Sequence, residues 1–466
     1  MVQAEMGVVM AGKWKDVALE DVADEITVGY VGPMASEYVE NGVPFLRSLN
    51  VEPLRVNKND LKFITPEFHH KIKKSRLTPD DVVIVRTGKP GACSVVPEWL
   101  YDANCSDLVI VRCGDQLDKR FLAFYVNTMA TNHIAAHLVG AVQQHFNVGA
   151  ARTMRIKLPP LGEQKSIAHI LGTLDDKIEL NRRMNVTLEG MAQALFKSWF
   201  IDFDPVIDNI LVKNMAKCSD QNQPSPNLSQ RERDNIFDGI PDEFAERAEI
   251  RRQALADGTA NREAAKSFPT AFQQTETMGW IPDGWTECMF DVLAKPKKGK
   301  NITKQTIIEG NIPVVAGGLH PAYFHNAPNV YAPVITISAS GANAGFVNLY
   351  QQDIWASDCT YISSKETGFV YSTFLFLKNR QDQITHMQQG AAQPHVYPKD
   401  LLRLRLANPP RTRWQEMETT IAPLFHKISV NEKENQNLTK LRDTLLPKLI
   451  SGELRIEDAE KITEET

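Results

Sequence analysis

The stretch LPPLGEQKSIAHILGTLDDKI, at residues 158–178, decides the fold because the chain contains a second, altered version of it. That version, NPPRTRWQEMETTIAPLFHKI, lies at residues 408–428, an offset of 250 residues (408 minus 158). At this offset the match runs without a gap for about sixty residues, from Gly140 opposite Gly390 to Trp199 opposite Leu449. A repeat of this length predicts that the chain contains two copies of one structural unit.

Both versions carry a stripe of mostly apolar residues whose spacing alternates between four and three residues. This heptad spacing is typical of a coiled-coil helix. Asparagine occupies the same two places in each stripe, Asn181 and Asn185 in the first and Asn431 and Asn435 in the second. A buried asparagine in such a seam sets the register and the choice of partner. The stripes are Ile167, Leu171, Leu174, Ile178, Asn181, Asn185, Leu188, Ala192, Leu195 and Trp199, then Met417, Ile421, Leu424, Ile428, Asn431, Asn435, Leu438, Arg442, Leu445 and Leu449.

The two helices are expected to pair with each other in antiparallel orientation, since this brings the asparagines near the middle of each stripe together. A helix of about 33 residues spans ~50 Å and would act as a spacer between domains. Pro205 marks the expected end of the first helix, while Pro447 and Gly452 predict a kink and a C-cap in the second. The alternative, that each helix packs only on its own domain, stays open.

The regions before the helices also correspond, although more loosely. Trp14 aligns with Trp285, and Ser106-Asp107 aligns with Ser357-Asp358. Apolar runs predict strands at 82–86 and 108–113, and residues 121–138 are expected to be helical. The predicted fold class is therefore α+β, with two pseudo-repeated β-rich domains separated by two long helices that form an antiparallel coiled coil.

The repeat also suggests a division of the chain into six parts. The segment 206–279 belongs to neither copy and is polar, with a helical stretch at DEFAERAEIRRQALADG. We expect a partly flexible connection there. The expected parts are an N-terminal domain at 1–160, a central helix at 161–205, the connecting segment at 206–279, a C-terminal domain at 280–410, a second helix at 411–455 and an acidic tail at 456–466.

Composition excludes several other classes of protein. The chain has no apolar run near the ~20 residues that a membrane helix needs, and the N-terminus has no basic leader, so we expect an untargeted cytoplasmic protein. Six scattered cysteines without a CxxC pair indicate free thiols rather than disulfides or a zinc site. The net charge of −5 is unusual for a DNA-binding protein, but the acidic tail can mask a locally basic face.

Basic and polar residues in the two domains are candidates for contacts with nucleic acid. Lysine and arginine bind phosphates, and side chains in turn-rich stretches can reach base edges. For any single residue in a basic run, a solvated surface is the simpler interpretation. The candidates are Arg47, Lys71, Lys73, Lys74, Arg76, Arg86 and Lys89 in the first domain, and Lys297, Lys298, Lys300, Lys304, His320, Tyr323, Ser338, Ser340 and Asn343 in the second.

A search for catalytic motifs finds none. No phosphate-binding GxxxxGK[ST], GxSxG or HExxH occurs. Asn408-Pro409-Pro410 resembles the loop of adenine methyltransferases, but Arg411 replaces the aromatic residue and the repeat partner is Leu158-Pro159-Pro160. The prolines therefore predict the start of a helix, and the chain is not expected to be an enzyme or to hold a metal.

This pattern resembles the specificity subunit of Type I restriction-modification systems across nearly the whole chain. The residues that carry the resemblance are 158–178, the Gly-Ala-x-Gln turns at 140–143 and 390–393, and GWIPDGW at 279–285. The second helix departs from the pattern at its start, where residues 411–415 replace the run LGEQK.

The resemblance implies two target-recognition domains that each read half of a bipartite site in double-stranded DNA. It also implies two partner modification subunits that use S-adenosylmethionine to methylate adenine N6, and restriction subunits that use ATP and magnesium. None of these cofactors would bind this chain. Two alternatives remain: a specificity subunit of a methylation-only system, and a coiled-coil scaffold that does not bind DNA.

Overall fold

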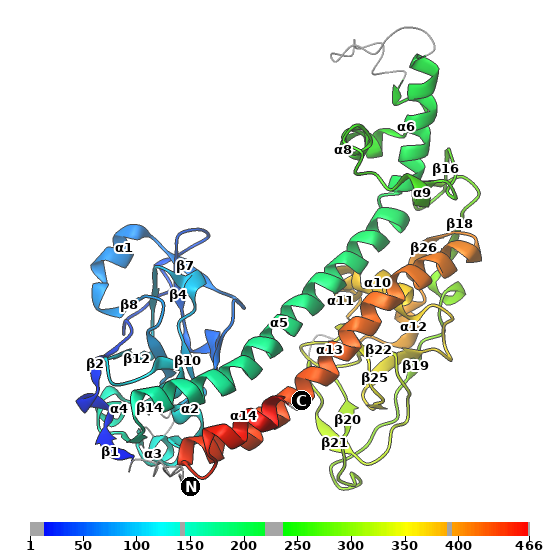
Figure 1. Ribbon diagram of the computed structural model, residues 1–466. Coiled ribbons are helices and arrows are strands. Elements are labelled where there is room, and N and C mark those ends of the chain that lie inside the picture. The colour runs from blue at the N-terminus through cyan, green and yellow to red at the C-terminus, as the bar shows by residue number, and fades with distance from the viewer. Residues whose placement is uncertain (1–13, 140–144, 220–235, 389–393, 465–466) are drawn as a thin grey trace, which may run out of the picture. The chain divides into compact units, whose positions relative to one another are not determined.

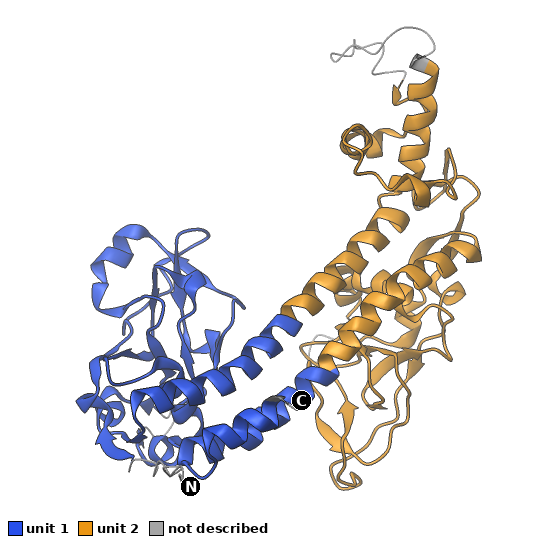
Figure 2. Cartoon of the chain, in the orientation of Figure 1, with its two compact units in different colours: residues 1–181, 433–466 blue, residues 182–432 orange. Residues whose placement is uncertain are grey.

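The computed structural model describes residues 14–139, 145–219, 236–388 and 394–464 and divides the chain into two compact units. Unit 1 contains residues 1–181 and 433–466, and unit 2 contains residues 182–432 (Figure 2). Each unit therefore contains one β-rich domain and parts of both long helices. We call residues 14–158 the N-terminal domain and residues 280–408 the C-terminal domain.

The N-terminal domain is built around an antiparallel four-stranded sheet in the order β10-β9-β12-β2. The central strands are apolar on both faces and almost entirely buried, as the runs at 82–86 and 108–113 predicted. One face packs against helix α2, whose Phe121 and Leu122 are fully buried. The strands are β2 (Ala23–Val28), β9 (Val82–Val85), β10 (Cys93–Val95) and β12 (Leu108–Cys113), and the helices are α2 (Lys119–Thr128), α3 (Thr131–Ala136) and α4 (Val148–Arg152).

A second, five-stranded sheet forms the outer lobe of the N-terminal domain, on the side away from β1 and α4 (Figure 1). Its core is a small aromatic cluster that includes Phe45 and Phe68. The lobe consists of β3 (Tyr38–Val39), β7 (Lys62–Ile64), β4 (Val43–Leu46), β11 (Ala103–Cys105) and β8 (Arg76–Leu77), with α1 (Pro66–Lys71). Three short pairs complete the domain: β1 (Lys15–Ala18) with β15 (Arg155–Leu158), β5 (Val51–Glu52) with β6 (Arg55–Val56), and β13 (Leu138–Val139) with β14 (His145–Phe146).

The C-terminal domain repeats this plan with a smaller outer lobe. Its main sheet has the order β19-β25-β22-β23, and the outer lobe has the order β21-β20-β24. The pair β18–β26 closes the domain as β1–β15 closes the other. The elements are β18 (Thr286–Met289), β19 (Lys297–Lys298), β20 (Ile312–Val315), β21 (Tyr323–His325), β22 (Val334–Ser338), β23 (Val347–Tyr350), β24 (Trp355–Ala356), β25 (Cys359–Ser363), β26 (Arg405–Asn408), α10 (Val370–Lys378), α11 (Gln381–His386) and α12 (Pro398–Leu401).

The two long helices are α5 (Leu161–Phe200) and α13 (Arg411–Ser451). In unit 1, Asp175 accepts a hydrogen bond from Arg442 at 2.6 Å, and Asn181 donates to Asn435 at 3.0 Å. From the first contact to the second, the residue number rises along α5 and falls along α13. The two helices therefore pair in antiparallel orientation there, which confirms the predicted coiled coil.

Unit 2 shows the same antiparallel pairing. The side chain of Asn431 donates to Asn185 at 2.7 Å, and the ring of Phe200 stacks on Trp414 with centroids 4.6 Å apart. The predicted register asparagines therefore form the two pairs Asn181–Asn435 and Asn185–Asn431, which are equivalent under the 250-residue offset.

The ends of the long helices differ from the expectation in detail. Helix α5 ends at Phe200, and Pro205 lies in the first turn of the next helix, where its missing N–H costs no hydrogen bond. Helix α13 continues through Pro447, and Gly452 follows it with a φ of +77°, as predicted for a C-cap. The acidic residues beyond it form helix α14 (Ile456–Glu464), which buries Ala459 in the core of unit 1.

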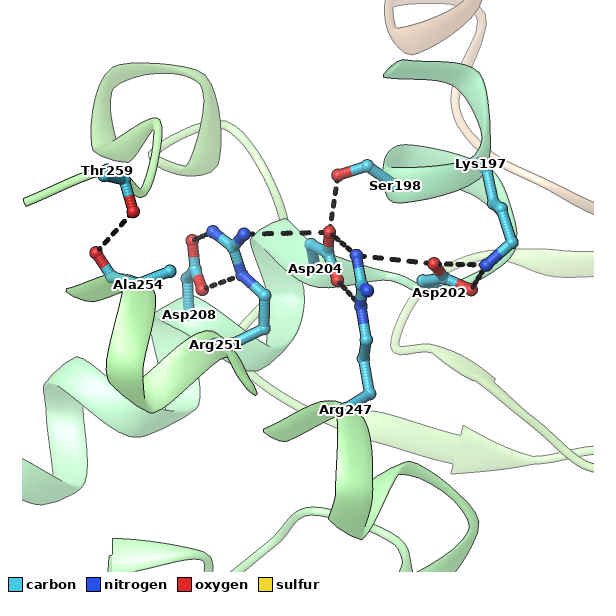
Figure 3. A network of polar contacts seen from close by, with 9 residues as sticks. All are labelled: Lys197, Ser198, Asp202, Asp204, Asp208, Arg247, Arg251, Ala254 and Thr259. Atoms are coloured by element: carbon cyan, nitrogen blue, oxygen red, sulfur yellow. Dashed lines mark hydrogen bonds and ion pairs between the residues drawn. The ribbon is translucent and has the colours of Figure 1, made fainter. Parts of the chain in front are cut away.

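The segment between the copies is folded where it is described. Its helices and strands are α6 (Asp204–Ser219), α8 (Ala245–Ala256), α9 (Arg262–Ala265), β16 (Phe272–Gln274) and β17 (Trp280–Pro282), and α8 matches the predicted helical stretch. Two arginines of α8 form bidentate ion pairs with buried carboxylates of α6 (Figure 3). Arg247 donates to Asp204 at 2.7 and 2.6 Å, and Arg251 donates to Asp208 at 2.8 and 2.6 Å.

The cysteines whose side chains are described are all free. Burial raises the pKa of Cys359 to about 12 and raises those of Cys93 and Cys105 as well. These thiols are therefore packing residues rather than nucleophiles. Among the described residues, no helix is both long and apolar enough to cross a membrane.

Candidate nucleic-acid interface

Three loops of the N-terminal domain meet at one place and are joined by main-chain hydrogen bonds. The N–H of Arg86 donates to the carbonyl of Asp107 at 3.3 Å, and the N–H of Phe146 donates to the carbonyl of Arg86 at 3.0 Å. The N–H of Gly91 closes the first loop on Val85 at 2.9 Å. We call residues 86–91, 106–107 and 145–146 the loop junction of this domain.

The C-terminal domain contains the same loop junction, at residues 338–345, 357–358 and 395–396. The N–H of Ala339 donates to Asp358 at 3.4 Å, and the N–H of Val396 donates to Ala339 at 3.0 Å. The N–H of Gly345 donates to Ser338 at 2.8 Å. Main-chain carbonyl and N–H groups at equivalent positions therefore hold the loops together in both domains, even though the side chains differ.

One glycine in each junction explains why the loops keep this shape. Gly91 and Gly345 have φ values of +94° and +83°, in the left-handed region that side chains disfavour. A Cβ on Gly91 would lie 2.9 Å from Ile134, and one on Gly345 would lie 3.2 Å from Ile384. The two isoleucines are themselves 250 residues apart, so the repeat extends to this packing contact.

The side chains that the two junctions present are chemically different. Arg86 donates from Nε to the carbonyl of Phe146 at 3.2 Å and lies 3.4 Å from Asp107, while Lys89 is exposed. At the second junction, the hydroxyl of Ser340 donates to Asp358, and Asn343 is half-buried. One junction thus offers guanidinium and ammonium groups, and the other offers hydroxyl and amide groups.

Arg47 lies beside the first junction but already has an anionic partner. Its guanidinium donates to the carboxylate of Asp60 at 2.7 Å. Hydrogen bonds from Lys62 and Arg47 hold the pKa of Asp60 at about 2. The structure therefore gives Arg47 a role in anchoring its loop, and a contact with DNA phosphate would have to compete with Asp60.

The basic run of the N-terminal domain lies in the outer lobe rather than in the loop junction. Lys71 ends α1, and Lys73 and Lys74 form the 3-10 turn that follows; all three side chains are exposed. Arg76 donates to Asp102 at 2.9 Å. The three lysines therefore form an exposed cationic surface at the base of α1.

A cleft of about 650 Å³ lies between strand β2, helix α4 and Lys74. Its lining includes Glu20, Asp24 and Glu25 as well as Arg152, whose side chain donates to the carbonyl of Ile26 at 3.1 Å. The lining thus contains three carboxylates and two cations, and this negative net charge repels phosphate. The cleft is therefore not part of the candidate nucleic-acid interface.

The lysine run of the C-terminal domain is only partly available for binding. Lys297 lies 2.9 Å from Glu366; burial would raise the pKa of this carboxyl, but hydrogen bonds from Lys297 and Ser363 hold it below the usual value. Lys298, Lys300 and Lys304 are exposed on β19 and the segment after it.

The remaining candidates lie on and beside the β20–β21 hairpin. His320 is exposed in the connecting loop, and Tyr323 is exposed at the start of β21. The hydroxyl of Ser338 donates to the carbonyl of Gly317 at 2.9 Å and so anchors the hairpin loop to the second junction. The structure thus brings Ser338 and Ser340 next to the hairpin that carries His320.

Sequence reasoning missed the neighbours that make this hairpin distinctive. Leu319 and Phe324 are exposed beside His320 and Tyr323, although apolar residues in a strand pattern are usually expected to be buried. In the other domain, the exposed ring of Tyr101 and the cation–π pair of Lys58 with Trp99 were also missed. An aromatic residue at an edge strand carries no sequence signal for exposure, because exposure depends on which strands pair beside it.

The glutamines of the repeated Gly-Ala-x-Gln turns, Gln143 and Gln393, lie outside the described residues. Of the histidines that follow them, His145 belongs to β14 and His395 forms a backbone bridge with Ser340. Among the residues that are described, no group of three or more histidine, cysteine or acidic side chains is placed to hold a metal ion.

Comparisons with known proteins agree with this architecture. The profile of the Type I restriction modification DNA specificity domain matches residues 12–190 and 282–440, which is more than half of the chain. The Type I restriction enzyme HindI specificity subunit of Haemophilus influenzae is 26% identical over 330 residues, covering 65% of this chain and 69% of the relative. The MjaIX specificity subunit of Methanocaldococcus jannaschii is 26% identical over 393 residues, covering 82% of this chain and 80% of the relative.

A solved structure extends the likeness to the fold of nearly the whole chain. The S subunit of a Type I restriction-modification system from M. genitalium superposes with a TM-score of 0.52 at 14% identity, covering 96% of this chain and 98% of that structure. Two β-rich domains with the same strand plan and the same loop junction, together with paired long helices, define a duplicated α+β protein. The chain belongs to the Type I restriction-modification DNA specificity family, whose members are DNA-recognition components and not enzymes.

Proposed function

We propose that this chain reads a bipartite sequence in double-stranded DNA and directs the chemistry of partner subunits to it. The observation that carries the proposal is the pair of loop junctions, which share their main-chain hydrogen bonds but differ in the side chains they present. A common frame with different side chains is what two readers of different base sequences require, because base edges are distinguished by the donors and acceptors that face them.

Charge supports duplex DNA as the ligand. Each domain carries exposed lysines: Lys89 in the loop junction and Lys71, Lys73 and Lys74 in the outer lobe of the first domain, and Lys298, Lys300 and Lys304 on and after β19 in the second. Such residues bind phosphates and set the orientation of the protein on the duplex, while the junction side chains select the sequence. The negative net charge of the chain does not oppose this, since acidic residues concentrate elsewhere, as in helix α14.

In this proposal the partners supply all the chemistry. Two modification subunits bind S-adenosylmethionine and methylate adenine N6, for which the base leaves the helical stack. Restriction subunits use ATP and magnesium to cut unmethylated DNA. The chain itself holds no cofactor, works in the cytoplasm, and meets its partners through the long helices and the segment 206–279.

The experiment that tests this proposal is co-expression with the modification subunit, followed by mapping of N6-methyladenine across the host genome. A split motif, with two short half-sites around a fixed gap, should appear with this chain and disappear when it is deleted. Methylation that is absent or unchanged on deletion would overturn the proposal and favour the scaffold alternative. Cutting of unmethylated DNA by the full complex distinguishes a restriction system from a methylation-only one.

A further inference from the structure

The β20–β21 hairpin of the C-terminal domain exposes three large apolar side chains. Leu319 is 47% exposed, Tyr323 is 42% exposed and Phe324 is 54% exposed. Tyr323 and Phe324 lie opposite Val314 and Pro313 in the antiparallel register, on the edge strand of a three-stranded sheet. Tyr323 and Phe324 are successive strand residues and therefore expose a ring on each face of β21, with Leu319 in the loop before it. Large apolar side chains exposed together on one element suggest a binding surface.

Cationic residues adjoin this hairpin through a chain of contacts. The indole N–H of Trp355 donates to the carbonyl of Lys300 at 2.8 Å, and the ring of Trp355 contacts that of His325 on β21, with centroids 4.9 Å apart. The segment that contains Lys300 and Lys304 makes a second contact with the hairpin, because the N–H of Ile308 donates to His325 at 3.1 Å. The lysine segment is thus fixed against β21, whose neighbouring residues are Tyr323 and Phe324.

We propose that the β20–β21 hairpin is the base-reading ribbon of the C-terminal domain and enters the major groove of its half-site. Because β20 lies between β21 and β24, the part of the hairpin that can enter the groove is the edge strand β21 with the loop before it, and apolar side chains there contact the methyl group of thymine. Tyr323, Phe324 and Leu319 supply the apolar contacts, while Lys300 and Lys304 hold the flanking phosphates. The charge of the lysine segment selects a polyanion as the occupant over a second protein or a second copy of this chain.

The base of the hairpin is also anchored to the loop junction of the same domain. Ser338 and Ser340 of the loop junction contact its base: Ser338 donates to Gly317, and a Cβ on Gly317 would lie 2.7 Å from the carbonyl of Ser340. The junction therefore fixes the direction in which the hairpin leaves the domain. Since positioned side chains on a rigid element discriminate best, this anchoring favours the hairpin as the reading element.

The test uses the complex with the modification subunits and rests on the proposed function, because it starts from the split motif mapped for the unaltered chain. We expect the double variant Tyr323→Ala/Phe324→Ala to make one half-site degenerate and leave the other unchanged. Affinity for a duplex that carries the mapped motif should fall about tenfold to a hundredfold, as for loss of one or two base contacts. Val292→Ala, an exposed apolar residue of the same domain outside the hairpin, is the matched control.

The double variant Lys300→Ala/Lys304→Ala gives an independent readout. It should weaken binding to all duplexes alike and lower the salt dependence of binding by about one to two phosphate contacts, without changing the motif. An unchanged motif with affinity within about twofold in the aromatic variant would overturn the hairpin proposal while leaving the function intact. A split motif that never appears with the unaltered chain would instead overturn the function. Loss of self-association in the aromatic variant but not in the Val292→Ala control, with the motif unchanged, would identify the hairpin as a protein contact and overturn the proposal as well.

Discussion

Two arginines of helix α8 show how strongly burial changes the worth of an ion pair. Arg251 faces Asp208, whose side chain is 2% exposed, whereas its neighbour Arg252 pairs with Glu249 on the surface. A buried carboxylate that loses its partner is still desolvated, and this lowers the stability of the folded state. A surface ion pair contributes little to that stability. The packing of α8 on α6 within the connecting segment therefore depends on a few side chains.

We expect Arg251→Met to destabilise the packing of α8 on α6 by about 3–5 kcal/mol, because it leaves Asp208 charged, buried and unpaired. Arg252→Met, one residue along the same helix, is the matched control and should change stability by less than about 1 kcal/mol. Hydrogen exchange of the amides in residues 245–256 measures the local free energy of opening. Equal protection in the two variants would contradict the expected role of the buried pair.

The glutamate Glu418 joins helix α13 to the first turn of α10. Its carboxylate accepts hydrogen bonds from the N–H of Tyr371 at 3.0 Å and from the N–H and hydroxyl of Ser372 at 2.9 and 2.7 Å. Burial nevertheless raises the pKa of Glu418 above its ordinary value of 4.5. The folded state therefore binds a proton at this residue more tightly than the unfolded chain does.

This raised pKa predicts a pH dependence with a definite sign. The stabilisation from the proton on Glu418 is fully present below pH 4.5 and is lost as the pH rises through the raised pKa. The unaltered protein should therefore gain stability relative to Glu418→Gln as the pH falls through that window. Urea unfolding of both proteins between mildly acidic and neutral pH measures the difference, and parallel stability curves would show that the residue does not titrate as described.

At the scale of the elements, the register of the paired helices depends on two asparagine pairs. Asn431 is fully buried, and its Nδ2 donates to Asn185, while its Oδ1 has no hydrogen-bond partner among the described residues. A buried amide that is only partly satisfied lowers stability but excludes registers in which it would meet an apolar residue.

A double-mutant cycle tests this role. Asn185→Leu alone should destabilise unit 2 by about 1–3 kcal/mol, because it leaves the amide of Asn431 buried without a partner. The double variant Asn185→Leu/Asn431→Leu should recover most of that loss, and thermal unfolding measures the coupling between the two sites. The equivalent pair Asn181–Asn435 in unit 1 serves as the internal comparison. Additive losses in the cycle would mean that the two amides do not act together.

Local sequence patterns were sufficient to predict the two long helices and helix α8 of the connecting segment. The heptad spacing predicted both helices and both asparagine pairs, because each rule needs only positions a few residues apart. The ion pair of Arg47 with Asp60 and the exposure of Phe324 were not predictable, since both depend on which strands lie side by side. For the same reason the sequence suggested the basic candidates but not the loop junctions that group some of them.

At the scale of the whole molecule, unit 1 is assembled from two separate parts of the chain, whereas unit 2 is one continuous segment. Unit 1 combines residues 1–181 with residues 433–466, so the last helices complete the core of the first domain. Leu445 and Leu449 of α13 belong to the same buried cluster as Phe121 of α2. The two parts of unit 1 are therefore held together by packing of buried side chains, and not by the chain that connects the two copies.

We expect two co-expressed fragments, residues 1–227 and 228–466, to associate and to bind DNA as the intact chain does. The helices α5 and α13 bury apolar stripes that neither fragment can cover alone. Copurification of the untagged fragment with the tagged one measures the association, and the double variant Leu445→Asp/Leu449→Asp should abolish it. Fragments that fold separately and do not copurify would show that the connecting segment is needed for assembly.

The loop junctions have a consequence for how such a protein can change over generations. The main-chain hydrogen bonds that join the loops of each junction can form whatever the side chains are, apart from the glycine with a positive φ. In the proposed function, substitutions at Arg86, Lys89, Ser340 or Asn343 alter what is recognised, while the main-chain hydrogen bonds of the junctions remain. New recognition can accumulate one residue at a time in one domain while the other domain, with its separate junction, continues unaltered.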